Sequence, residues 1–197
     1  MLPELLVQYH LPEQDFRAGR GLRTNAWRAG LGKSESSPVE VLRNYPKQTG
    51  EDEGLVLAIH ALSHWLWRHR IPLLPKLLSK FNRIVFAVEL PAETRIGKGV
   101  RLNYSGLGTV LHARAVIGDR VEIGPGVVIG GRSELYDVPV IEDDVTLGVG
   151  AKVLGPVRVG RGAVVGANAV VLHDVPADAV VVGVPARVVR IGPKKEG

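Results

Sequence analysis

The chain has 197 residues, enough for one domain of ordinary size with an extension, and it contains no cysteine, which excludes a disulfide framework, a thiolate zinc site and a cysteine nucleophile. Its 25 lysines and arginines against 20 aspartates and glutamates give a formal net charge of +5, which is weak support for an anionic partner. Only 5% of the residues are aromatic while 45% are hydrophobic, so aliphatic side chains must fill the core, and with 24 glycines this composition favours a β repeat.

Residues 1–53 show no sustained apolar period. We interpret them as an N-terminal extension, mobile or loosely packed, in which short helices around 4–10 and 39–44 are the alternative. The first ten residues hold proline and glutamate where a secretory signal needs a basic start and an apolar run. No stretch of about 18 consecutive apolar residues follows, so no membrane span is predicted and we expect a cytoplasmic protein.

Residues 54–93 are predicted to form a helical segment. Apolar side chains recur there at a spacing of three to four residues, which places them on one face of a helix: Leu55, Ile59, Leu62 and Leu66. Prolines then break this helix, and residues 73–81 begin another. His60 and His64 lie one turn apart, a spacing able to hold a metal, but the glutamate that a zinc-protease motif places after the first histidine is absent. We therefore interpret both histidines as packing residues.

Residues 94–191 repeat with a period of six, and a basic tail, 192–197, follows. An aliphatic residue marks each hexad: Ile96, Leu102, Leu111, Ile117, Ile123, Ile129, Ile141, Leu147, Val153, Val159, Val165 and Val171. The next residue is often glycine: Gly97, Gly118, Gly124, Gly130, Gly148, Gly160 and Gly166. A period of six suits a short strand plus a corner, repeated three times per turn of a triangular solenoid. We predict about four coils, with the aliphatic residue pointing inward and the glycine supplying the unusual backbone of the corner.

This register resembles that of the hexapeptide-repeat acyltransferases, whose fold is a left-handed parallel β-helix. Two segments narrow the resemblance to serine acetyltransferases: S-H-W-L-W at 63–67 and G-V-P-A-R-V-V at 183–189. The stretch 150–172 is similar throughout, and the resemblance covers about residues 55–191. It implies a mainly β fold, in which a small α-helical segment precedes the left-handed parallel β-helix.

The resemblance also implies a function. It implies acetyl-CoA as the acetyl donor, the hydroxyl of L-serine or a similar small acceptor, a place in cysteine biosynthesis, and no metal. It further implies a homotrimer, or a hexamer of two trimers, with active sites in the grooves between neighbouring β-helices. The acceptor hydroxyl attacks the thioester in this chemistry, so a histidine base and backbone N–H groups for the oxyanion are expected. The basic residues form no stripe interleaved with aromatic residues, so no nucleic-acid partner is predicted.

The positions that carry catalysis in the family differ in this chain. The family's Asp-His pair matches Asn103 and Tyr104, and tyrosine is a poor base because its hydroxyl stays protonated at neutral pH. The histidine of the family's acceptor-binding loop matches Val138, and the preceding arginine matches Asp137. The residues that identify serine are therefore not carried over.

His112 is the candidate for a relocated base. It follows an inward aliphatic residue at a corner, and counting three hexads per coil stacks it beneath Gly130. The longest interruption of the repeat, 131–140, leaves from the same corner, and a flap beside a histidine suits such chemistry. The alternative is an exposed corner histidine without a role, which is the favoured interpretation of His173.

The resemblance places a CoA groove along small residues of adjacent coils. The matching positions are Gly131, Val149 and Ala167, with Gly148 and Asn168 beside them. The CoA phosphates would meet basic residues at the C-terminal end: Arg187, Lys194 and Lys195.

Three functions stay open at this point. The first is serine O-acetylation. The second is the same chemistry on a sugar or another small hydroxyl or amine, which the lost Asp-His pair favours. Shorter relatives in envelope or polysaccharide biosynthesis also share the patterns at 89–99 and 105–110. The third is a catalytically impaired trimeric scaffold, favoured by Tyr104.

Overall fold

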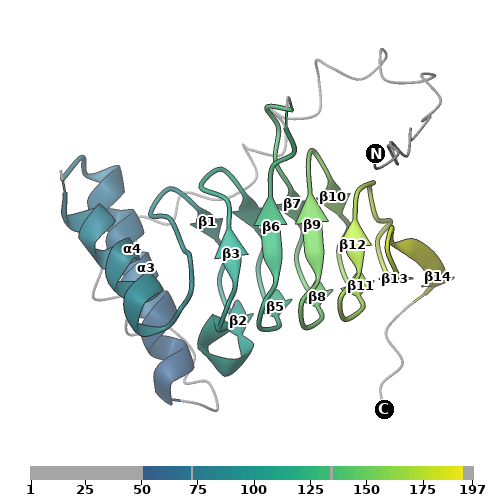
Figure 1. Ribbon diagram of the computed structural model, residues 1–197, viewed down its shortest axis with the longest axis horizontal. Helices are drawn as coiled ribbons and strands as arrows, with labels where there is room; N and C mark the ends of the chain where they lie inside the picture. The colour runs from purple at the N-terminus through teal and green to yellow at the C-terminus, as the bar shows by residue number, and fades with distance from the viewer. Residues whose placement is uncertain (1–50, 72, 134, 193–197) are drawn as a thin grey trace, which may run out of the picture. The chain divides into compact units, whose positions relative to one another are not determined.

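The computed structural model describes residues 51–71, 73–133 and 135–192 (Figure 1). Two helices, α3 (Glu51–Arg68) and α4 (Leu74–Val85), precede a parallel β-solenoid. The predicted extension up to residue 50 and the tail from 193 onward lie outside the described residues. In the described ranges, neither helix combines the length and the apolar character that a bilayer crossing needs.

Short strands, three to a coil, build the solenoid. In chain order they are β1 (Arg95–Ile96), β2 (Arg101–Leu102), β3 (Val110–Leu111), β4 (Val116–Ile117), β5 (Glu122–Ile123), β6 (Val128–Gly130), β7 (Val140–Ile141), β8 (Thr146–Leu147), β9 (Lys152–Leu154), β10 (Arg158–Val159), β11 (Val164–Val165) and β12 (Val170–Val171). β13 (Ala179–Val182) pairs in parallel with β11, and β14 (Arg187–Ile191) closes the solenoid antiparallel to β13.

Equivalent strands of successive coils form three sheets. Sheet A holds β3, β6, β9 and β12, sheet B holds β1, β4, β7 and β10, and sheet C holds β2, β5, β8, β11, β13 and β14. The chain therefore turns three corners in each coil, which we call the B–C, C–A and A–B corners after the sheets that they join. The four coils in Figure 1 confirm the mainly β solenoid predicted from the six-residue period.

Two positions of each hexad fill the interior. The aliphatic position is buried in every coil except at Ile96, which is half-buried at the open edge of the first coil. The position four residues later is buried as well: Val100, Ala115, Val121, Val127, Val145, Ala151, Val157, Ala163 and Ala169. Large and small side chains thus alternate around a narrow core, which explains why the chain needs so few aromatic residues.

The corner glycines have a different role from the one predicted. The glycine after the aliphatic residue is needed for close approach between coils, not for an unusual backbone. A Cβ on Gly124 would lie 2.8 Å from Val149 N, and one on Gly118 would lie 2.7 Å from Asp143 N. The left-handed backbone falls two residues later, as at Gly126 with φ of 68°. The six-residue pattern therefore predicts the corner but places its left-handed residue two positions too early.

The buried face of α3 agrees with the prediction only in part, since Leu66 is buried and Ile59 and Leu62 are half-buried. Leu55 is 48% exposed, whereas Val56 and Leu57 are buried and join the solenoid core. His60 and Ser63 lie on the buried side with them. The apolar pattern missed part of this face because the face includes polar side chains, one of which is satisfied where Ser63 Oγ donates to Pro75 O at 2.9 Å.

The B–C corner carries a ladder of charged side chains. Arg120 donates two hydrogen bonds to the Asp144 carboxylate, at 2.6 and 2.8 Å, and Arg161 pairs with Asp143 at 2.9 Å. The hydrogen bonds from Arg120 lower the pKa of Asp144. Asp119 Oδ1 accepts from the backbone N–H of Lys98 at 2.7 Å. These groups hold one another from coil to coil, so this corner serves the fold.

Candidate active site

The candidate residues lie on two different corners of the solenoid. Most of them follow the C–A corner: Asn103, Tyr104, Gly148, Val149, Ala167 and Asn168. His112 and Gly131 lie on the A–B corner, where β3 and β6 end. Sheet A separates the two corners, so one chain by itself does not bring the two groups together.

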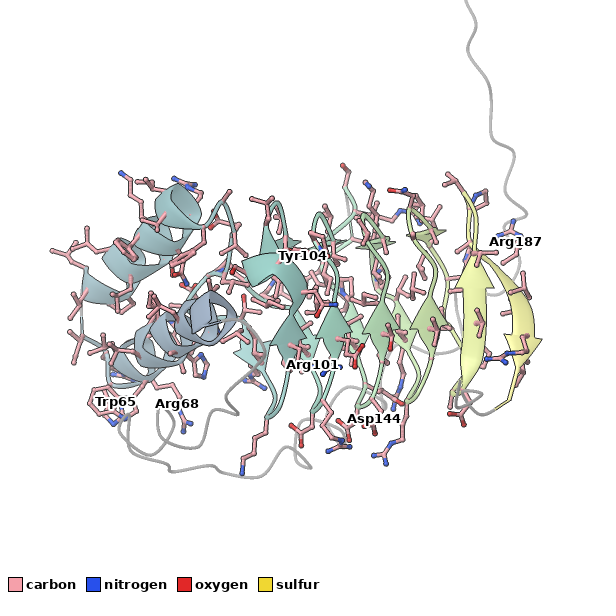
Figure 2. The ribbon with its side chains drawn as sticks, turned by 90° about the horizontal axis from the view of Figure 1, so that it is seen from below. Trp65, Arg68, Arg101, Tyr104, Asp144 and Arg187 are labelled. Carbon is pink, nitrogen blue, oxygen red and sulfur yellow. The ribbon has the colours of Figure 1, made fainter. Side chains whose placement is uncertain are left out.

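Tyr104 lies in a short 3-10 turn, η1 (Asn103–Gly106), which enlarges the C–A corner of the first coil. Its backbone is left-handed, with φ of 54° and ψ of 44°, and Ser105 beside it has φ of 56°. Two adjacent non-glycine residues in this region are strained, and such strain concentrates at functional sites. The Tyr104 side chain is 77% exposed, and Figure 2 places it near the helix-bearing end of the solenoid. The neighbouring Asn103 is exposed as well.

Farther along the same corner, small residues of two coils stack closely. A Cβ on Gly148 would lie 2.7 Å from Ala167 N, and Asn168 N donates to Val149 O at 2.8 Å. Asn168 adopts the left-handed conformation, and its amide oxygen lies over Gly150. Val149 and Ala167 are exposed. The corner is thus a strip of closely stacked coils on which Val149, Ala167 and Asn168 are exposed.

His112 is half-buried, and both its backbone and its ring make hydrogen bonds. Its N–H donates to Ile129 O at 2.8 Å, which puts it beside Gly130 as the hexad count predicted. Its ring Nδ1 accepts a hydrogen bond from the backbone N–H of Arg114 at 3.1 Å. An accepting Nδ1 carries no proton, so in the neutral ring the proton resides on Nε2. The free side of the ring therefore presents an N–H donor.

The loop after Gly131 folds back toward His112. Tyr136, on this loop, lies with its ring 3.9 Å from the guanidinium carbon of Arg114, close enough for a cation–π contact. Arg114 thus contacts His112 through its backbone and the loop through its side chain. The interrupted repeat predicts the loop but not this pair, because the contact joins different coils and no spacing rule predicts it.

Arg187 begins β14 and lies opposite Val182, so it sits at the C-terminal end of the solenoid (Figure 2). It is exposed, and its Nη1 donates to Ala186 O at 3.1 Å. Lys194 and Lys195 lie outside the described residues. Arg187 and Tyr104 therefore mark opposite ends of the solenoid.

The remaining histidines form no metal centre in the described part of the chain, where no group of three or more His, Asp or Glu side chains is placed to hold an ion. His60 and His64 lie with their rings 6.2 Å apart on α3. Burial lowers the pKa of His60 to about 4, and the neighbouring His64 contributes. His173 is exposed on the A–B corner of the fourth coil.

Comparison with known proteins agrees with this architecture. The family of bacterial transferase hexapeptides (six repeats) matches residues 139–173. Serine acetyltransferase of Synechococcus elongatus is 39% identical over 153 residues, which are 77% of this chain and 60% of that relative.

Two solved structures are similar as well. Serine acetyltransferase of Brucella abortus in complex with coenzyme A has a TM-score of 0.69 and 32% identity over 73% of this chain and 58% of that one. Soybean serine acetyltransferase complexed with serine has a TM-score of 0.68 and 35% identity over 75% of this chain and 66% of that one.

Fold and repeats together define a hexapeptide-repeat β-solenoid. Within that class, the chain is similar to serine acetyltransferases over about three quarters of its length. It spans about three fifths of the length of the curated relative from Synechococcus elongatus.

Proposed function

We propose that the protein is an acetyl-CoA-dependent O-acetyltransferase that acts on L-serine or a similarly small hydroxyl acceptor. The observation that carries this proposal is the likeness of its cap and solenoid to a serine acetyltransferase bound to coenzyme A. The C–A corner supports it, because Val149, Ala167 and Asn168 are exposed there on adjacent coils and form a surface along which a pantetheine arm can lie. Arg187 offers a cation for a phosphate at the end of that strip.

We further propose that the site is completed between subunits of a homotrimer. In a closed ring of three, each subunit presents one surface to its neighbour on one side and a different surface on the other. The A–B corner with His112 then faces the C–A corner of the next subunit. This arrangement accounts for candidate residues that lie on two corners of one chain.

The proposed reaction needs a proton acceptor for the hydroxyl and a donor for the oxyanion. The acceptor oxygen attacks the carbonyl carbon of the acetyl thioester, the bond between that carbon and sulfur breaks, and the proton lost by the hydroxyl ends on the sulfur of free CoA. In the tautomer described here, His112 donates from Nε2 and suits the oxyanion or the departing sulfur. To act as the base at Nε2 instead, the ring must release the N–H of Arg114. The Arg114–Tyr136 contact holds the loop that controls this change.

A sugar hydroxyl is the second candidate acceptor. Asp137 and Val138 replace the residues that the family uses for the carboxylate of serine, and a negatively charged side chain there opposes a carboxylate-bearing acceptor. The exposed Tyr136 ring on the same loop offers a flat apolar surface instead.

The experiment measures thiol release from acetyl-CoA with serine and with a panel of nucleotide sugars. We expect turnover with one of them, and His112→Ala lowers kcat about a hundredfold or more. His173→Ala, a corner histidine of the fourth coil, is the matched control and leaves kcat unchanged. Binding of CoA without turnover for every acceptor would contradict the proposal and favour a catalytically impaired scaffold.

A further inference from the structure

Helix α4 reverses the polarity of an ordinary surface helix. Its side toward α3 carries polar groups: Asn82 is buried and donates to Val56 O at 3.1 Å, and the hydroxyl of Ser79 lies 3.4 Å from that of Ser63. Its other side exposes six large apolar side chains, which we call the apolar arc: Leu73, Leu74, Leu77, Phe81, Ile84 and Val85. Leu77 is 60% exposed and Ile84 is 71% exposed. A surface helix of a globular protein normally buries such a stripe, so the apolar arc is suited to contact a further apolar surface.

Positive charge accompanies the apolar arc. Residues 54–88 contain five lysines and arginines and no aspartate or glutamate. This segment alone therefore has a formal charge of +5, the same as that of the whole chain. Lys76 and Lys80 are exposed on α4, and Lys80 is three residues from Leu77 and four from Ile84, so it borders the apolar arc. Neither lysine has an ion pair among the described residues, whereas Arg83 pairs with Glu89 at 3.4 Å. Lys76 and Lys80 are therefore available to an anionic partner.

We propose that the apolar arc and its two lysines bind the surface of an anionic lipid bilayer. A basic amphipathic helix lies in the plane of the interface, with its apolar side chains among the acyl chains and its lysines at the headgroup phosphates. With 12 residues, α4 is too short to cross a bilayer, which needs about 20. The cap thus places the protein against a membrane while the solenoid points away from it. This inference does not rest on the proposed acetyl transfer.

Charge favours lipid over the two other occupants. Residues 1–50 contain seven lysines and arginines against five aspartates and glutamates, so their net charge has the same sign as the two lysines beside the arc. A second copy related by a two-fold axis would place the same lysines against each other, which costs affinity. Anionic headgroups match both the sign of the charge and the apolar surface beside it.

The first test is flotation of the full chain with vesicles. We expect binding to vesicles of phosphatidylglycerol and phosphatidylcholine in equal parts, weak binding to phosphatidylcholine alone, and loss of binding in high salt. Lys76→Gln with Lys80→Gln lowers the partition coefficient about thirtyfold, because each cation near an anionic surface contributes about a factor of five to ten. Lys98→Gln, on the B–C corner, is the matched control and has no effect. Equal binding by the double variant and the unmodified chain would overturn the proposal.

The second test locates the contact and identifies any other occupant. Because the chain contains no cysteine, Phe81→Cys and Val189→Cys each accept a single environment-sensitive fluorophore. We expect a blue shift on anionic vesicles at position 81 and none at position 189, which lies on β14. A probe at 81 that is blue-shifted without vesicles and does not respond to them would overturn the proposal. A dependence of that signal on protein concentration would then assign the arc to a second copy, and its absence would assign the arc to residues 1–50.

Discussion

The solenoid and the helical cap, formed by α3 and α4, differ in the polarity of what they bury and what they expose. In the solenoid, every coil buries aliphatic side chains and pairs its backbone with the next coil. In the cap, the polar side chains of His60 and Asn82 are buried while the apolar arc is exposed. Among the described residues, His60 Nδ1 and Asn82 Oδ1 have no hydrogen-bond partner. The difference indicates that the solenoid supplies stability and a framework for chemistry, whereas the cap has a surface shaped by what it contacts.

The largest expected effect on stability lies in the solenoid. Gly124→Ala places a Cβ 2.8 Å from Val149 N, so the backbone of the next coil must move. We expect the free energy of unfolding to fall by about 3 kcal/mol, measured by denaturant titration.

The matched control for this change is Gly131→Ala. A Cβ there meets Val138 Cγ1 at 3.8 Å, an ordinary contact, so we expect little change in the free energy of unfolding. Equal destabilisation by both variants would show that corner glycines act through chain flexibility and not through the spacing of coils.

The next effect concerns the cap and depends on pH. His60 has a pKa of about 4 in the folded chain against an ordinary value of 6.5. Between these values the unfolded chain binds more protons, so the contribution of this residue is fully present above pH 6.5 and is lost as the pH falls toward 4. We expect a loss on the order of 3 kcal/mol across that window, followed by denaturant titration at several pH values.

His60→Leu removes the titrating group and is expected to flatten this pH dependence. It also removes an unpaired polar atom from the interior, so stability at pH 7 is maintained or raised. If stability depends on pH as steeply in the variant as in the unmodified chain, another residue causes the dependence. His64 is then the first to examine, because burial lowers its pKa too.

The smallest effect is expected on the apolar arc. Leu77→Gln with Phe81→Gln changes side chains that are already about half exposed or more, so the free energy of unfolding shifts by about 0.5 kcal/mol or less. Thermal unfolding of the double variant measures this. A large destabilisation would mean that the arc is packed in the intact protein, and the contrast between solenoid and cap would fail.

The sequence predicts the solenoid better than the cap, because the solenoid repeats its pattern of buried residues in every coil and the helix α3 shows its pattern only once. Each hexad repeats the same buried position, so Ile117, Ile123 and Ile129 support one another's assignment, and counting coils placed His112 beside Gly130. In α3 a single helix gives a single pattern, and buried His60 and Ser63 shift the true face away from Leu55.

The candidate site was predictable only in part. Spacing located the interrupted corner and the loop, but it gave no information on contacts between coils. The Arg114–Tyr136 stack and the Nδ1 hydrogen bond of His112 both depend on how separate segments meet in space. The left-handed turn at Tyr104 was missed for a further reason, since non-glycine residues seldom adopt that conformation and the sequence gives no signal of it.

The most direct test of this division compares two variants in two assays. His112→Ala and the double variant Leu77→Gln with Phe81→Gln are each measured for thiol release from acetyl-CoA and for flotation with anionic vesicles. We predict that the first loses turnover and keeps flotation, while the second keeps turnover and loses flotation. Loss of both properties in either variant would contradict the assignment of chemistry to the solenoid and of surface binding to the cap.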